Sequence, residues 1–247
     1  MELTYDICQY ALSLAEKEND TYYVARFNTI IASTFTYRSV YDSSFIYFDK
    51  ALTGFKKINN KEREANVYNG MANNYKRQGD FVTAHTYYMK VLDLCKYTGI
   101  TRTYVIALGN IGNIHRKLNN PERAIYYLEQ ERELAEKFDI LTGRVQAYYE
   151  LGKIYMDQGR LNEALDYMNI IISLIGTDSP VFGSRTNETL ADIYILRGNY
   201  GKAFEHAAEC LRYAEMLNDI NLFISAWNLY ATIYLKQNSY KAVPSPL

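Results

Sequence analysis

The chain has 247 residues, and its 27 Lys and Arg against 28 Asp and Glu give a formal net charge of -1. This balance excludes a surface built for general binding to polyanions, and we expect no nucleic-acid partner. With 48% hydrophobic and 22% charged residues, the composition is that of a folded chain. No stretch approaches the ~18 apolar residues that a membrane span requires, so we expect no membrane insertion and a cytoplasmic location.

A pattern returns every 39 or 40 residues, in which a small residue stands three positions before an aromatic residue or His. The pairs are Ala32/Phe35, Ala72/Tyr75, Gly112/His115, Gly152/Tyr155, Ala191/Tyr194 and Ala231/Tyr234. Seven positions after the small residue stand Ser39, Gly79, Asn119, Gly159, Gly198 and Asn238. These are residues that favour turns.

In chain order, residues 1–20 align with the second half of a repeat, because Ala11 lies 40 positions before Ala51. The complete repeats and the partial one that follows are 21–60, 61–100, 101–140, 141–179, 180–218 and 219–247. In the last of these we expect a second helix that begins at Tyr240 and is stopped by Pro244 and Pro246. The pattern thus starts and finishes in mid-repeat, and we expect a fragment of a larger protein or, as the alternative, an unusual natural cap.

Each repeat carries the periodicity of two helices. Leu151, Ile154 and Tyr155 are three and four positions apart, a helical spacing. Gly159 then ends the helix, and a second apolar run begins at Leu161. Small residues where two helices cross allow close approach, so we expect antiparallel hairpins that bury their apolar faces by stacking.

The strings at 148–165 and 190–203 resemble tetratricopeptide repeats. The resemblance covers nearly the whole chain and implies an all-α, right-handed superhelical α-solenoid of about twelve helices, with 1–247 as one domain. The period exceeds the usual ~34 residues of that family. It is similar to variants in Pins-type adaptors, Rap-type bacterial regulators and the sensor regions of bacterial signalling proteins.

The resemblance also places the first helix of each pair on the concave side, and helical geometry gathers certain positions on one face. The candidate peptide-binding residues at or beside these positions are Asn69, Asn73, Lys76, Arg77, Asn110, Asn113, Arg116, Lys117, Tyr149 and Lys153. Asn side chains suit the backbone amides of an extended peptide, and the cations favour an acidic segment. Alternatively, the cations only solubilise helix ends and offset the helix dipole.

Signatures of catalysis are missing from the sequence: there is no Gly-rich phosphate loop, no Gly-x-Ser-x-Gly and no His-Glu-x-x-His. His115 stands where other repeats have Tyr or Phe, which favours a hydrogen-bonded core imidazole over a metal ligand. Cys8, Cys95 and Cys210 have no paired spacing, which favours buried thiols. We therefore expect no catalytic residue, metal or cofactor.

Two functions remain. The first is a non-catalytic scaffold that binds a protein or peptide segment, as the sensory or regulatory region of a larger bacterial signalling protein. The alternative is a structural module that forms a homodimer through its helical ends and its surface of Tyr, of which the chain has 25.

Overall fold

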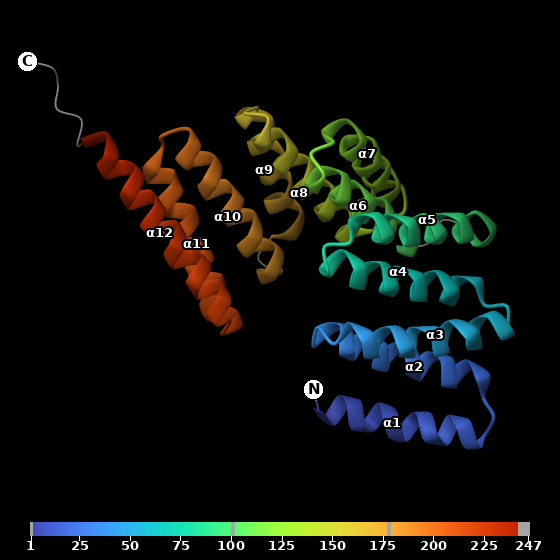
Figure 1. Cartoon of the computed structure of the whole chain (residues 1–247). Helices are drawn as coiled ribbons and strands as arrows, with labels where there is room; N and C mark the ends of the chain where they lie inside the picture. The colour runs from blue at the N-terminus through green and yellow to red at the C-terminus, as the bar shows by residue number, and fades with distance from the viewer. Residues whose placement is uncertain (1, 100–101, 177–178, 242–247) are drawn as a thin grey trace, which may run out of the picture. The chain divides into compact units, whose positions relative to one another are not determined.

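The computed structural model describes residues 2–99, 102–176 and 179–241, and every regular element in these ranges is an α-helix (Figure 1). The twelve helices of the described residues are α1 (Glu2–Lys17), α2 (Thr21–Tyr37), α3 (Tyr41–Lys57), α4 (Lys61–Arg77), α5 (Phe81–Thr98), α6 (Arg102–Lys117), α7 (Pro121–Lys137), α8 (Leu141–Asp157), α9 (Leu161–Ile175), α10 (Pro180–Leu196), α11 (Tyr200–Leu217) and α12 (Ile220–Lys241). The chain is therefore all-α, as the repeat pattern predicted. No helix in the described ranges has the length and apolar character needed to cross a membrane.

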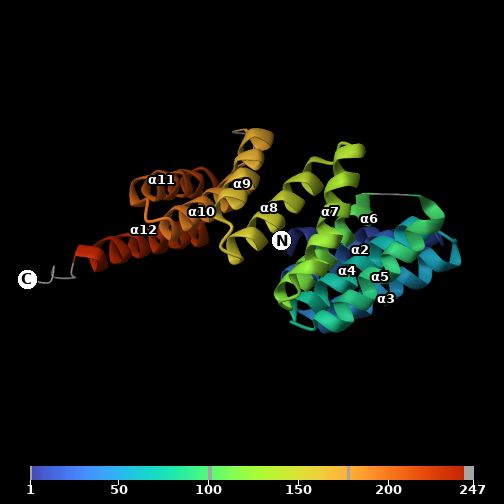
Figure 2. The same ribbon diagram turned by 90° about the horizontal axis from the view of Figure 1, so that it is seen from above.

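The chain divides into two compact units, Met1–Glu131 and Arg132–Leu247, with the boundary inside α7. In the first unit, the helices from α1 to α6 pack in chain order, α2 also contacts α4, and α4 also contacts α6. In the second unit, α8 to α12 pack in chain order, and α10 also contacts α8 and α12 (Figure 2). First helices of successive hairpins therefore lie side by side within each unit. The expectation of one domain over residues 1–247 stays a prediction.

Each hairpin turn contains one residue in the left-handed backbone region. The residues are those seven positions after the small residue, with φ of 59° at Ser39, 82° at Gly79, 54° at Asn119, 73° at Gly159 and 71° at Gly198. Gly adopts this conformation without steric cost and Asn tolerates it. The next residue often caps the following helix: Asp80 accepts a hydrogen bond from the backbone N–H of Thr83 at 3.0 Å. A short segment thus ends one helix and begins the next.

The last predicted turn does not form. Asn238 lies inside α12, which runs unbroken to Lys241, so the expected start of a second helix at Tyr240 is wrong. A turn there would interrupt helical hydrogen bonds, and no following helix among the described residues packs on α12 to offset that loss. Pro244 and Pro246, expected to stop the second helix, lie outside the described residues.

The small residues lie where the two helices of a hairpin approach closely. A Cβ added at Gly112 would lie 2.6 Å from Cγ of Leu128 in the facing helix, far closer than atoms in contact can come. Ala32, Ala72 and Ala191 are fully buried at the equivalent positions. The prediction of close helix crossings at these residues is confirmed.

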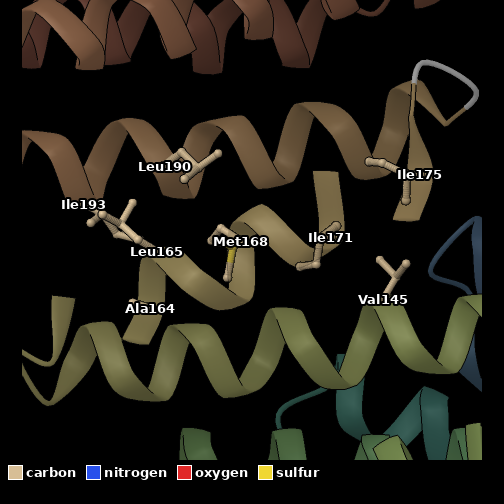
Figure 3. Packing of buried hydrophobic residues seen from close by; sticks show 8 residues of the cluster. All are labelled: Val145, Ala164, Leu165, Met168, Ile171, Ile175, Leu190 and Ile193. Atoms are coloured by element: carbon tan, nitrogen blue, oxygen red, sulfur yellow. The ribbon is translucent and has the colours of Figure 1, made fainter. Parts of the chain in front are cut away.

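The apolar core of the second unit lies between α8, α9 and α10 (Figure 3). Met168 and Ile171 of α9 are directed between Val145 of α8 and Leu190 and Ile193 of α10, and all five are at most 1% exposed. Burial of one such side chain stabilises the fold by about 1.5–3 kcal/mol. The apolar side chains of these helices therefore pack against neighbouring helices. The polar side chains of the first helices are the ones that remain as candidates for binding.

The cysteines and His115 lie in the packed interior. Cys8, Cys95 and Cys210 are buried thiols, as their spacing predicted. Burial raises the pKa of Cys210 to about 12, so this thiol stays protonated and unreactive near neutral pH. His115 is 8% exposed and stacks on Tyr127 with ring centroids 5.5 Å apart. Its Nε2 has no hydrogen-bond partner among the described residues. The expected hydrogen bond is therefore absent at this atom, and the stacking on Tyr127 fixes the position of the ring.

Candidate functional site

The predicted binding residues of α4 and α6 lie in the first unit, on adjacent helices. Lys76 of α4 donates from Nζ to Oδ1 of Asn110 of α6 at 2.5 Å. The structure thus brings this predicted pair together, but as a bond between two first helices. A ligand would have to compete with this contact.

The three remaining Asn residues differ in how much of their hydrogen-bonding capacity is used. Oδ1 of Asn73 accepts from the hydroxyl of Tyr88 at 2.6 Å. Oδ1 of Asn69 is enclosed, with no hydrogen-bond partner among the described residues. Asn113 is half-buried. Asn69 therefore has an unused acceptor, whereas Asn73 is partly committed to the core.

The remaining cations of this set occupy helix ends. Arg77 and Lys117 are exposed and Arg116 is half-buried, and all three stand in the last turn of α4 or α6. Lys117 lies 5.7 Å from the ring centroid of Phe81. These positions agree with both interpretations, a basic surface for an acidic ligand and an offset to the helix dipole.

Tyr149 and Lys153 lie on α8 in the second unit, whereas the other eight candidate residues lie in the first. The hydroxyl of Tyr149 accepts from Oγ1 of Thr189 at 3.3 Å, and the Arg185 guanidinium lies 4.4 Å from the ring centroid of Tyr149. Burial raises the pKa of Asp192, and the positive charge of Lys153 partly opposes that shift. The two residues thus belong to a polar contact region between α8 and α10.

Gly109 stands at the position that Asn69 holds in the preceding repeat, and a steric reason explains why no side chain occurs there. The carboxylate of Glu131, which is 1% exposed, occupies the space that a side chain at 109 would need. Equivalent second-helix positions hold Ala51, Val91 and Ile171. A buried carboxylate thus lies at this point between α6 and α7.

Sequence reasoning missed a cavity of about 210 Å³ between α2 and α4 in the first unit. It is lined by Arg26, Thr29, Ile30, Phe55, Arg63 and Asn66. Neither Arg26 nor Arg63 forms an ion pair with a carboxylate in the described part of the chain. Their guanidinium carbons instead lie 5.9 Å from the ring of Tyr23 and 6.0 Å from the ring of Tyr22, respectively.

The cavity combines two cations with neutral polar groups. Asn66 at its edge accepts from Oγ1 of Thr103 of α6 at 2.5 Å, which connects the cavity to the next first helix. Arg26 stands six positions and Arg63 nine positions before the small residue of its repeat, outside the positions considered from sequence. Comparing basic residues between adjacent first helices could have found them. Among the described residues, no three His, Cys, Asp or Glu side chains converge to hold a metal ion.

Comparison with known proteins agrees with the repeat pattern. Models of the family described as Tetratricopeptide repeat match residues 23–97, 63–137 and 145–175. Outer dynein arm-docking complex subunit 4 of Danio rerio is 26% identical over 141 residues, which are 55% of this chain and 28% of that protein. Response regulator aspartate phosphatase E of Bacillus subtilis (strain 168) is 32% identical over 105 residues, 41% of this chain and 27% of that protein. The chain spans less than a third of the length of either relative.

A solved structure shows the same fold. The Rap conjugation gene regulator of the plasmid pLS20, in complex with the Phr* peptide, matches with a TM-score of 0.74 and 17% identity, covering 87% of this chain and 60% of that chain. An identity this low carries the likeness of fold and no shared ligand. The family models, however, together match more than half of the residues, and the chain belongs to the tetratricopeptide repeat family.

Proposed function

We propose that this chain binds an extended, acidic segment of another protein on the first-helix surface formed by α2, α4 and α6, and catalyses no reaction. The observation that carries the proposal is the cavity with two guanidinium groups that have no carboxylate partner among the described residues. Arg63 is half-buried and Arg26 is exposed, and guanidinium groups at a cavity favour a carboxylate that accepts bidentate hydrogen bonds.

Neighbouring groups extend this surface along α4 and α6. Asn113 of α6 is half-buried, and its side-chain amide can exchange hydrogen bonds with the backbone of an extended segment. Arg77 and Lys117 add positive charge at the ends of the same helices. The Rap conjugation gene regulator, which has a similar fold, is in complex with the Phr* peptide, and this supports a peptide as the kind of ligand. That relationship supports a regulatory role in a bacterial signalling protein, and the cytoplasmic location stays a prediction.

The test uses fluorescence anisotropy with two labelled pools of extended peptides, one carrying Asp and Glu at random positions and one carrying Lys at the same positions. We expect the acidic pool to bind and the Lys pool not to bind. Arg63→Ala should raise the Kd for the acidic pool by about tenfold to a hundredfold, as expected for loss of a charge-assisted hydrogen bond. Raised salt should weaken the binding.

Arg38→Ala is the matched control, because Arg38 is an exposed guanidinium just beyond α2 and outside the cavity. It should leave the Kd unchanged. Equal affinity for the two pools, or an unchanged Kd in Arg63→Ala, would remove the assignment.

A further inference from the structure

Two hairpins carry the same pair of tyrosine rings at equivalent positions. Tyr68 of α4 and Tyr87 of α5 have ring centroids 5.9 Å apart, and their ring planes meet at 50°. Tyr148 of α8 and Tyr167 of α9 stand 80 positions later, with centroids 5.8 Å apart and ring planes that meet at 45°. The two pairs therefore have nearly the same geometry, and the side chains around them make the difference.

Lysines of the chain itself stand over the rings of the earlier pair. Nζ of Lys90 lies 4.3 Å from the ring centroid of Tyr87 and 5.5 Å from that of Tyr68. Nζ of Lys56 lies 5.9 Å from the ring centroid of Tyr68. The negative face of an aromatic ring attracts an ammonium group at such distances. The place beside two rings in this geometry thus suits an ammonium group.

Both lysine positions are changed beside the later pair. Ile170 stands 80 positions after Lys90, and Glu136 stands 80 positions after Lys56. The hydroxyl of Tyr148 donates a hydrogen bond to Oε1 of Glu136 at 2.6 Å. The later pair thus keeps the two rings, while a carboxylate and an apolar side chain replace the two ammonium groups.

A cavity of about 270 Å³ borders the later pair, where α8 and α9 pack as one hairpin (Figure 1). All of its lining residues belong to the second unit. They are Arg132 of α7, Tyr148 of α8 and, from α9, Glu163, Asp166, Tyr167 and Ile170. The cavity therefore adjoins the same two ring positions, and the same third position, that Lys90 brings together in the second repeat.

The charges around the cavity favour a cation. Arg132 pairs with Glu136 at 3.0 Å, and Arg160 pairs with Glu163 at 2.5 Å. Asp166 is exposed and forms no ion pair with another described residue. Three carboxylates against two guanidinium groups leave a net charge of -1, which is the charge of Asp166.

We propose that this cavity receives a lysine side chain of a partner protein. The ammonium group of that lysine lies at the carboxylate of Asp166 and over the ring of Tyr148, and its aliphatic stem packs on Ile170, which is 38% exposed. The partner thus supplies the cation that Lys90 supplies inside the second repeat. This surface of the second unit is separate from the surface of α2, α4 and α6, and the two accept segments of opposite charge.

Methyl NMR of the 247-residue chain with labelled Ile side chains tests the site, because Ile170 is itself a reporter. The probe is Nα-acetyl-lysine N-methylamide, and the matched probe is the norleucine compound, which has the same stem without the ammonium group. We expect the Ile170 signal, identified by its loss in Ile170→Val, to shift with the lysine probe at a Kd of about 1–10 mM. The norleucine probe should bind at least about threefold more weakly.

This weak affinity for one lysine keeps the test apart from that of the first-helix surface, in which peptide pools are compared at micromolar concentration. Ile46 is exposed on α3 in the first unit. Its methyl signal should not shift with either probe, which excludes a general effect of added ammonium ions.

Asp166→Asn removes the charge that attracts the ammonium group, and it should raise the Kd for the lysine probe about twofold to fivefold. Glu205→Gln is the matched control. Glu205 is an exposed carboxylate at the equivalent position of the next repeat, in the same unit, and its loss changes the net charge of the chain equally. This variant should leave the Kd unchanged.

Ile170→Lys supplies the ammonium group from the chain itself, as Lys90 does in the second repeat. Its unfolding equilibrium constant, measured with urea, should be about twofold to fivefold lower than that of Ile170→Gln. Gln is a suitable comparison because Gln130 holds this position in the third repeat. The difference between the Lys and Gln variants should shrink when each is combined with Asp166→Asn.

Four results would overturn the proposal. The Ile170 signal does not shift with the lysine probe, the lysine and norleucine probes bind with equal Kd, Asp166→Asn leaves the Kd unchanged, or Ile170→Lys unfolds as readily as Ile170→Gln. Equal Kd values for the two probes would show that the cavity takes an apolar side chain without regard to charge.

Discussion

The hydroxyl of Tyr88 donates a 2.6 Å hydrogen bond to Oδ1 of Asn73, which joins a fully buried core ring to a residue predicted to bind ligand. This bond gives Asn73 a structural role beside any role in binding. Desolvation by burial raises the pKa of Tyr88 well above its usual value, so the phenol stays protonated and remains the donor at all physiological pH values.

We expect Tyr88→Phe to lower the free energy of unfolding by about 1–2 kcal/mol, because Oδ1 of Asn73 loses its partner in a half-buried place. Urea denaturation measures the change. Asn73→Ala should cost a similar amount, and the double variant should cost less than the sum of the two. Additive losses would mean that the bond contributes nothing to stability. Asn113→Ala is the control, because Asn113 is also a predicted binding residue but takes no part in the bond between Tyr88 and Asn73.

Glycines in the helices should respond to substitution according to the space around them. A Cβ at Gly112 would lie 2.6 Å from Cγ of Leu128 and 3.3 Å from the backbone oxygen of Ala124. Gly112→Ala should therefore lower the unfolding free energy by about 1–3 kcal/mol, as overpacking does.

Gly201 near the start of α11 provides the matched control. Its added Cβ would have Oδ1 of Asn199 as its nearest neighbour, at 3.8 Å, an ordinary contact distance. Gly201→Ala should raise the unfolding free energy by about 0.4–1 kcal/mol, because the unfolded chain loses conformational freedom. Thermal and urea unfolding of the two variants should thus move in opposite directions, and a shift in the same direction would contradict the steric argument.

Stability should fall between neutral and mildly acidic pH because of His115. Burial lowers its pKa first of all, and the charges of His85 and Arg123 lower it further. The unfolded state then binds protons at a higher pH than the folded state, so stability is full above the unfolded pKa of about 6.5. It declines as the pH falls from there toward the lowered folded pKa.

His115→Tyr should flatten this decline, and Tyr fits because Tyr75 and Tyr155 hold the same position in other repeats. The measurement is the urea midpoint at several pH values from about 7.5 to 5, on both sides of the ordinary His pKa of about 6.5. The remaining slope should come from His85 and His206, whose pKa values are also lowered by burial. An identical slope in His115→Tyr would show that its ring titrates alike in both states.

Much of the fold could be predicted because its determinants are local. Gly79 and Asn119 mark turns through a backbone conformation that few residues adopt, and Gly112 marks a crossing because any side chain there would collide with Leu128. Asn238 shows that such local signals are not sufficient, because this residue type favours a turn but Asn238 lies inside the helix α12. A turn of this type is stabilised by the packing of the two helices that it joins.

The sequence by itself determined that the chain forms helical hairpins with a period of 39 or 40 residues, where they turn and where they cross, because steric limits on single residues and helical spacing decide these features. Only the tertiary structure decided which polar side chains are available to a ligand. It commits Asn73 to Tyr88 and Lys76 to Asn110, and it brings Arg26 and Arg63 to the lining of one cavity. The physical reason is that hydrogen bonds and charge pairs between helices depend on distances that no spacing along the chain specifies.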